Sequence, residues 1–225
     1  MPAEARPLVI TVDGPAASGK GTLARSLAAA LGLPHLDTGR LYRAVGAALL
    51  AAGADPADAE RAEAAARALD PARLDDAALG GEAVAHAASV VAAIPSVRAA
   101  LLAFQRRFAA GPAGAVLDGR DTGTVVCPRA TVKLFLTATP EERARRRHDE
   151  LRARGEASIY AQVLAGIIER DRRDRTRAVA PLEPASDAVV IDTTRLDAAA
   201  VFEAALAVLR ARGSLAAGPR GRPDA

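Results

Sequence analysis

The chain has 225 residues, half of them hydrophobic and a quarter charged, which is enough for one sizeable α/β domain. Its net charge of +3 suits an anionic ligand, but a general nucleic-acid binder would carry a stronger basic excess and more than the 3% aromatic residues found here. The single cysteine, Cys127, excludes an intrachain disulfide, and no apolar run is long enough for a signal peptide or a membrane span, so we expect a cytoplasmic protein.

Short β-rich runs alternate with helical stretches along the chain, which is the pattern of a parallel, doubly wound α/β sheet. In chain order, strands are predicted over 8–12, 34–37, 115–118, 131–136 and 188–192. Most of these runs are continuously apolar, as expected for parallel strands that are buried on both faces. Three of them end at or just before an aspartate, where ligand-binding loops begin in open α/β sheets.

A glycine-rich segment joins the first strand to a helix predicted over 22–31. It consists of Gly14, Pro15, Ala16, Ala17, Ser18, Gly19, Lys20, Gly21 and Thr22. Its backbone amides can cradle phosphates, and Lys20 can reach the β- and γ-phosphates of ATP. Thr22 stands one position later than the hydroxyl residue of the general phosphate-loop pattern. We expect it to serve Mg²⁺, mostly through water and the ATP phosphates.

The segment 36–43 follows one helix later and predicts a second anion site. Asp37 or Thr38 can cap the next helix, whose N-terminus favours an anion. Arg43 lies one turn beyond Gly39 and can point toward the same space. The alternative is a capped surface helix with an exposed arginine.

Two later helix starts are predicted from capping residues. Thr139 followed by Pro140, with Glu142 at the third helical position, predicts a helix that begins at Pro140. Asp55 followed by Pro56 predicts another in the same way.

The loop 118–123 follows the third predicted strand and places an arginine and an aspartate between two glycines. Arg120 has the planar fork that grips phosphate, and Asp121 can accept hydrogen bonds from an amine such as the exocyclic amino group of cytosine. The alternative is an ordinary turn with a surface ion pair.

Two arginine-rich segments, 141–148 and 169–177, come later in the chain. In a helix, Arg170, Asp174 and Arg177 share one face, although such a run by itself is more often a self-paired, solvated surface. The two segments together, with Gly155 between them, predict a flap that closes its arginines onto a transferring phosphoryl group.

Taken in order, these segments resemble the bacterial cytidylate kinases. The matching stretches are 10–14, the Gly-Lys-Gly-Thr loop 19–22, 36–43, 88–98, 118–126 and 169–181. The resemblance implies a P-loop kinase fold with a five-stranded parallel sheet flanked by helices, an insert that binds the nucleoside monophosphate, and an arginine-rich lid. We expect one domain over 1–212, with the insert at about 40–110, the lid at about 143–175 and a disordered tail over 213–225. The stretch 74–85 is shorter than the family usually has, so a small insert is expected.

The resemblance also implies an activity, the transfer of the ATP γ-phosphoryl group to CMP or dCMP, with Mg²⁺ as cofactor and Lys20, Arg120 and Arg177 as catalytic residues. It implies base recognition by Ser89, Arg98 and Asp121. It further implies ribose contacts from Asp174 with Arg170 nearby, phosphate contacts from Arg43, Arg120 and Arg177, and a pocket lined by Thr38 and Tyr42. We expect a monomer that binds neither nucleic acid nor membranes.

Two alternatives stay open from the sequence. One is a small-metabolite kinase similar to shikimate kinase, whose neutral acceptor hydroxyl would need a base nearby. The other is a non-catalytic module that binds ATP or RNA through its basic helices, although few aromatic residues are present for stacking on bases.

Overall fold

Five parallel strands form a single sheet in a computed structural model, which describes residues 7–71, 74 and 77–214. The strands are β1 (Val9–Asp13), β2 (His35–Asp37), β3 (Ala115–Gly119), β4 (Val132–Thr137) and β5 (Val189–Asp192), in the spatial order β2-β3-β1-β4-β5. The predicted fold class is therefore confirmed, with strand ends displaced by one residue at most. The register pairs Asp13 with Gly119 and Asp37 with Asp118, so the carboxyl ends of the first three strands meet at one edge.

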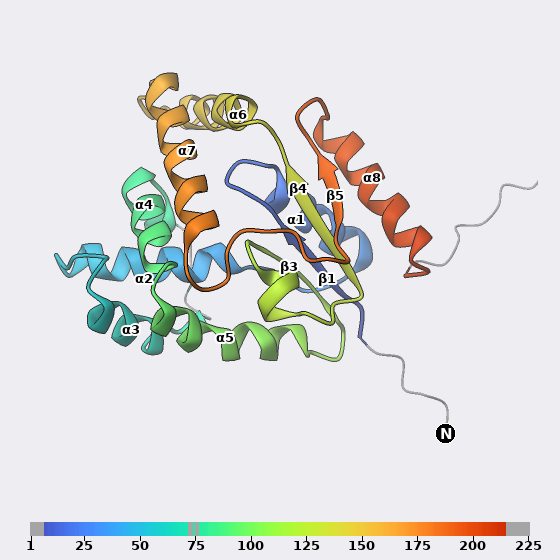
Figure 1. The fold of residues 1–225 in the computed structure, drawn as a ribbon, viewed down its shortest axis with the longest axis horizontal. Helices are drawn as coiled ribbons and strands as arrows, with labels where there is room; N and C mark the ends of the chain where they lie inside the picture. Colours follow the sequence, from blue (N-terminus) through green and yellow to red (C-terminus); the bar gives the residue numbers. More distant parts are fainter. Residues whose placement is uncertain (1–6, 72–73, 75–76, 215–225) are drawn as a thin grey trace, which may run out of the picture.

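Helices cover both faces of this sheet. Successive side chains of a strand point to opposite faces, and apolar side chains lie on both of them. On one face, Val116 packs in a cluster with Leu27 of α1 (Lys20–Leu31) and Leu209 of α8 (Ala198–Ala211). On the other face, the neighbouring Leu117 packs with Phe108 of α5 (Pro95–Ala109). Figure 1 shows α8 beside β5 and α5 across the opposite side of the sheet.

A separate group of helices forms the insert between β2 and β3. It contains α2 (Thr38–Ala51), α3 (Ala59–Arg67), the short η2 (Ala77–Leu79), α4 (Glu82–Val91) and the start of α5, around their own apolar cluster. A Cβ on Gly46 would lie 2.9 Å from the Cβ of Ala87, so the glycine lets α2 and α4 approach closely. Among the described residues, no helix alone has the length and apolarity to cross a membrane. Only α4 and α5 taken together, bent by 97°, meet those two criteria.

The prediction that Asp55 caps a helix beginning at Pro56 is wrong. The Asp55 carboxylate accepts a hydrogen bond from the Ala57 amide at 2.9 Å, which closes a turn instead. The helix begins three residues later, and Asp58 caps it by accepting from the Arg61 amide at 3.1 Å. Aspartate favours both roles, so the sequence alone does not distinguish an Asx turn from a helix cap.

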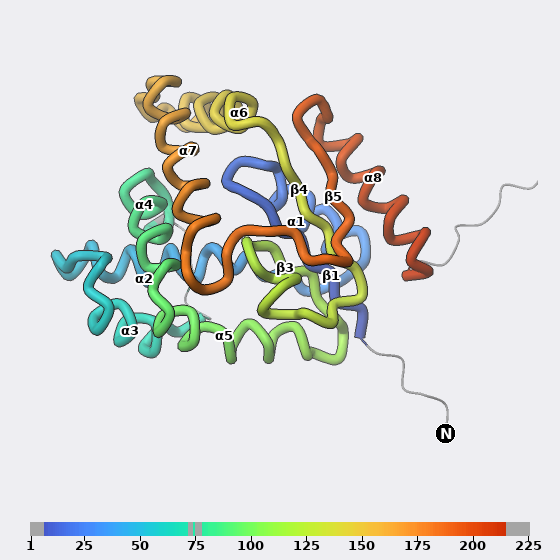
Figure 2. The backbone as a smooth tube through the Cα atoms, viewed as in Figure 1, coloured from blue at the N-terminus to red at the C-terminus, as the bar shows by residue number. Residues whose placement is uncertain are grey.

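The segment predicted as a lid, about 143–175, covers most of α6 (Pro140–Ala153) and α7 (Tyr160–Thr176). The Thr139 hydroxyl accepts from the Glu142 amide at 3.3 Å, so the predicted cap of α6 is confirmed. Gly155, at φ 76°, turns the chain between the two helices. The blue turn between β1 and α1 lies beside the start of α6 (Figure 2). Most of the predicted tail 213–225 lies outside the described residues.

Candidate active site

The phosphate loop occupies residues 14–19 and leads into α1 two residues earlier than predicted, at Lys20. Gly14 has φ 153°, and a side chain there would collide with the Leu136 carbonyl of β4. Gly19 has φ 89° and Ala17 has φ 58°, so the loop bends twice through the left-handed region. Successive bends of this kind turn backbone amides toward one concave side, where an anion binds.

Asp13, at the end of β1 and next to the phosphate loop, holds the loop that follows β3. The Asp13 carboxylate accepts from the Thr122 amide at 2.9 Å, the Thr122 hydroxyl at 2.8 Å and the Gly123 amide at 2.7 Å. Burial nevertheless raises the pKa of Asp13 to about 6, because three hydrogen bonds do not fully replace water around the charge. These contacts fix the loop that carries Arg120 and Asp121.

The strand ends β2 and β3 are joined at the same edge by polar contacts. The Thr38 hydroxyl donates to the Asp118 carbonyl at 2.8 Å, and the His35 Nε2 lies 2.8 Å from the Asp118 Oδ1. A Cβ on Gly119 would collide with the Thr38 hydroxyl, so this close approach of β3 to the start of α2 needs a glycine. Burial and the nearby Asp118 charge raise the pKa of Asp37. The carboxylates of Asp37 and Asp118 both line the cavity next to the phosphate loop. The Asp118 Oδ2 would lie 3.5 Å from a Cβ placed on Gly21.

A cavity of about 380 Å³ lies between the phosphate loop, α2, β3 and α7. Ala16, Lys20 and Gly21 form its phosphate-loop side. Its other walls carry five arginines: Arg43, Arg120, Arg147, Arg170 and Arg173. Arg43 and Arg120 were predicted to contact phosphate. Burial, followed by the Arg120 charge, lowers the pKa of Lys20 to about 7. Carboxylates also line this cavity, but Lys20, Arg120 and Arg170 form a cluster of positive charge within it that a polyphosphate would neutralise.

A smaller cavity of about 40 Å³ opens next to it and shares Gly39, Gly119, Arg120 and Arg170 with the larger one. It collects every residue predicted for the monophosphate except Arg43: Thr38, Tyr42, Ser89, Arg98, Arg120, Asp121, Arg170, Asp174 and Arg177. Ser89 and Arg98 come from α4 and α5, on the side of the insert. Asp174 comes from the last turn of α7 and Arg177 directly follows that helix, on the side of the predicted lid. Segments far apart in the sequence thus meet at one pocket.

Ion pairs order the charged side chains in the small cavity. Asp121 pairs with Arg98, and the Arg177 Nη2 lies 3.8 Å from the other Asp121 oxygen. The Arg120 Nε donates to Asp174 at 2.9 Å. The Arg98 guanidinium lies over the Tyr42 ring, 5.5 Å from its centre. Arg177 does not continue the helix as predicted, because α7 ends at Thr176 and Arg177 has an extended backbone. It still lines the same pocket as Arg170 and Asp174.

Several buried polar atoms around the two cavities lack a hydrogen-bond partner among the described residues. They are the Ser89 hydroxyl, Arg170 Nε, Arg173 Nε and Arg177 Nη2. Burial and the Arg120 charge also lower the pKa of Arg170 to about 10. Buried donors are rarely left without partners, so these atoms mark where a polar, anionic ligand would be held.

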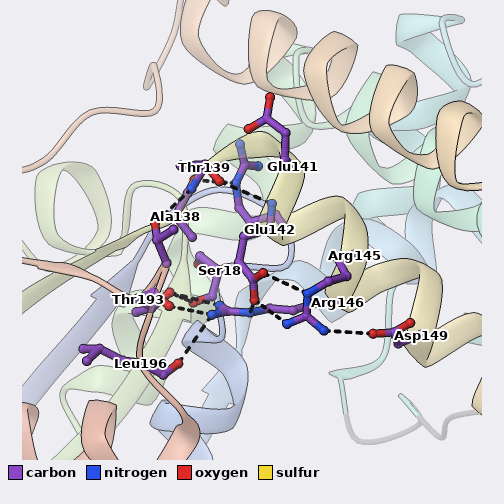
Figure 3. Close-up of polar contacts among 12 residues, drawn as sticks. Ser18, Ala138, Thr139, Glu141, Glu142, Arg145, Arg146, Asp149, Thr193 and Leu196 are labelled. Atoms are coloured by element: carbon purple, nitrogen blue, oxygen red, sulfur yellow. Dashed lines mark hydrogen bonds and ion pairs between the residues drawn. The ribbon is translucent and has the colours of Figure 1, made fainter.

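A third cavity, of about 510 Å³, lies on the far side of the phosphate loop, between α6 and the loop that follows β5. Ser18, Gly19 and Thr22 line it, together with Arg145 and Arg146 of α6. Arg146 donates to the Thr193 hydroxyl at 3.0 Å and to Glu142 at 2.8 Å, and so ties α6 to the β5–α8 loop (Figure 3). Thr22 therefore lies on the opposite side of the phosphate loop from Asp37 and Asp118, which line the 380 Å³ cavity.

Comparison with known families matches the family model of cytidylate kinase to residues 10–211. The chain belongs to the cytidylate kinase family. A cytidylate kinase of Methylobacterium sp. (strain 4-46) is 65% identical over 205 residues, which are 91% of this chain and 98% of that protein. Cytidylate kinases of Xanthobacter autotrophicus and Methylocella silvestris are 62% and 60% identical, over 91% and 94% of this chain and 98% of each relative.

Solved structures with the same fold are more distant in sequence. A gluconokinase from Sinorhizobium meliloti 1021 superposes with a TM-score of 0.52 at 18% identity, over 93% of this chain and 95% of the gluconokinase. A protein from Eubacterium ventriosum superposes with a TM-score of 0.54 at 12% identity, over 90% of this chain and 98% of that protein. These likenesses concern the fold alone.

Some residues that line or support these cavities were not predicted from the sequence. Asp13 was noticed only as one of the aspartates that follow strands, and its role in holding the 119–123 loop depends on the β1–β3 pairing. Arg173 stood in the predicted arginine run, but outside the stripe 170, 174 and 177. Arg143 and Asp171 form a buried pair beside the phosphate loop that no sequence pattern singled out.

Proposed function

We propose that this protein transfers the γ-phosphoryl group of ATP to CMP or dCMP, giving ADP and CDP or dCDP. The observation that carries the proposal is that Lys20 and the arginines Arg120 and Arg170 line one cavity, with a second, arginine-rich pocket opening beside it. A donor phosphate on the loop and an acceptor phosphate among the arginines would then face each other. Membership of the cytidylate kinase family supports cytosine as the acceptor base.

The acceptor oxygen of a nucleoside monophosphate is already anionic, so the reaction needs no strong general base. The protein's part is to hold the two phosphates in line and to neutralise the charge that spreads over the transferred group. Lys20, Arg120 and Arg177 are proposed for this role, since all three carry buried or half-buried cationic groups at the two cavities. Movement of α6 and α7 over the site would exclude water, which would otherwise accept the phosphoryl group.

The cytosine base is proposed to bind between the insert and the 119–123 loop. Asp121 accepts well from an exocyclic amino group, and Arg98 and the unpartnered Ser89 hydroxyl can bond the other polar atoms of the base edge. Asp174, held by Arg120, is proposed to accept from a sugar hydroxyl, with Arg170 nearby. Thr38 and Tyr42 complete the wall, and Arg43 contacts the phosphate from the larger cavity.

The nucleoside part of ATP is proposed to occupy the cavity between α6 and the β5–α8 loop, since that cavity begins at Ser18, Gly19 and Thr22. Mg²⁺ bound with ATP would supply positive charge that reduces the charge of the phosphates. Thr22 can serve it through water, and Asp37 and Asp118 fit the role as well. Their carboxylates stand together beside the phosphate loop, and their mutual repulsion would be relieved by a cation.

An acceptor assay tests the proposal directly. ADP formation is measured with CMP, dCMP, UMP, AMP and shikimate as acceptors, and CMP and dCMP are expected to give the highest kcat/KM. The shikimate-kinase-like and RNA-binding alternatives are not favoured, because the chain belongs to the cytidylate kinase family. Shikimate as the preferred acceptor, or ATP-independent retention on RNA without turnover, would refute the proposal. A cytoplasmic monomer that binds neither nucleic acid nor membranes is part of the same proposal, and sedimentation checks the monomer.

A further inference from the structure

A buried ion pair lies where the predicted lid meets the phosphate loop. Arg143, in the first turn of α6, is 1% exposed, and Asp171, in α7, is 6% exposed. The two side chains make a bidentate contact, with Arg143 Nη1 to Asp171 Oδ1 at 3.0 Å and Arg143 Nη2 to Asp171 Oδ2 at 2.6 Å. Arg143 also donates from Nε to the Ala138 carbonyl at 2.9 Å.

The same guanidinium reaches the phosphate loop. Arg143 Nη1 donates to the Ala16 carbonyl at 3.2 Å. In a planar trans peptide the carbonyl and the following amide point in opposite directions, so this contact turns the Ala17 amide away from Arg143. Ala16 and Ala17 both line the 380 Å³ cavity, and Ala17 has a left-handed backbone that few non-glycine residues adopt. Arg143 therefore fixes a strained part of the loop that would cradle the donor phosphates.

Asp171 connects the pair to the acceptor side. It lies in α7 directly after Arg170 and three residues before Asp174. Both of those residues line the small cavity, and Arg170 lines the large one as well. The pair thus spans three elements: the loop proposed to hold ATP, the root of α6, and the helix that carries arginines proposed for the acceptor.

We infer that Arg143 and Asp171 are positioning residues that set the placement of the phosphate loop relative to the acceptor-binding face of α7. Arg143, at the start of the predicted lid, contacts the phosphate loop, and Asp171, near the end of the lid, is held by Arg143. Closure of the lid would therefore move the segment between these two residues. A buried ion pair contributes little net stability compared with well-packed apolar side chains, because desolvation offsets most of its attraction. Its contact to the Ala16 carbonyl of the phosphate loop and its bidentate contact to α7 therefore point to a geometric role.

The test compares an apolar replacement of the pair with a matched control. The double variant Arg143→Met/Asp171→Leu removes both charges while keeping the packing volume, so its Tm is expected to stay near that of the unchanged protein. Its kcat with CMP is expected to fall by about tenfold or more, because misplaced reacting groups lose rate steeply. CMP affinity without ATP, measured by calorimetry, is expected to change less than threefold. The control is Arg67→Met/Glu63→Leu, an exposed pair at 2.6 Å on α3, with kcat unchanged within twofold.

The conservative variant Asp171→Asn keeps the side-chain shape and one acceptor oxygen. It is expected to show an intermediate loss of kcat with the same unchanged CMP affinity, and it decides the question if the double variant does not fold. A double variant, or failing that an Asp171→Asn variant, with kcat within twofold of the unchanged protein would overturn the inference. So would a loss of kcat that merely follows a lowered Tm. The inference rests on the proposed kinase activity, and an unchanged protein without CMP-dependent ADP formation would instead refute that proposal.

Discussion

Replacing Arg177 by alanine is the sharpest single test of the acceptor site. The Arg177 side chain is 4% exposed, and its Nη2 lies 3.8 Å from Asp121 without a hydrogen-bond partner among the described residues. Burial, followed by the nearby Arg98 charge, lowers the pKa of Arg177, which indicates a cation that is not fully neutralised by protein groups. An anionic phosphate would complete its contacts.

The magnitude follows from that environment. A charge-assisted hydrogen bond to a transferring phosphoryl group in a desolvated site contributes about 2–4 kcal/mol to transition-state stabilisation. We therefore expect Arg177→Ala to lower kcat/KM for CMP by about 30- to 900-fold. Because Arg177 also donates to the Ala180 carbonyl, a small loss of stability is expected as well, of about 1 kcal/mol.

Steady-state kinetics with varied CMP, together with thermal unfolding, measure both effects. The matched control is Arg175→Ala, which removes the same charge from an exposed position of α7 and is expected to change kcat/KM less than twofold. A value for Arg177→Ala within threefold of the unchanged protein would refute the reasoning that the pocket neutralises a phosphate through this side chain.

Three further predictions concern other parts of the site. ATP binding at pH 8 is expected to take up close to one proton, because burial lowers the pKa of Lys20 to about 7 and the phosphates restore its charge; calorimetry in buffers of different ionisation enthalpy measures this, and Lys20→Met should abolish it. Gly119→Ala would push a Cβ against the Thr38 hydroxyl and to 2.8 Å from Thr122, so kcat/KM is expected to fall by about tenfold or more; kcat/KM within twofold of the unchanged protein would contradict the need for a glycine at this position. Asp121→Asn is expected to lower kcat/KM for CMP by about 30-fold or more and for UMP by less; an unchanged CMP-to-UMP ratio would contradict base recognition by this carboxylate.

Local sequence signals were sufficient for the sheet and for the phosphate loop. A largely apolar run such as 8–12 is expected to be buried between two layers, and the glycines of the loop meet a backbone requirement that most other residues cannot. The helix cap at Thr139 could also be predicted from the sequence, because the amide that it accepts from lies only three residues away. At Asp55 the same kind of local signal was ambiguous, since a turn and a helix cap use one residue type.

The sequence by itself determined the strands, the phosphate loop and, through the motifs, which side chains were candidates for the acceptor. Only the tertiary structure decided how they meet: that Ser89, Arg98, Asp121 and Arg177 line one pocket, and that Arg143 and Asp171 pair beside Ala16. The physical reason is the sequence distance over which each kind of interaction acts. Backbone propensities and caps act within a few residues, whereas the Arg98–Asp121 contact spans 23 residues and the Arg143–Ala16 contact spans 127. Such long-range contacts depend on how whole helices pack on the sheet.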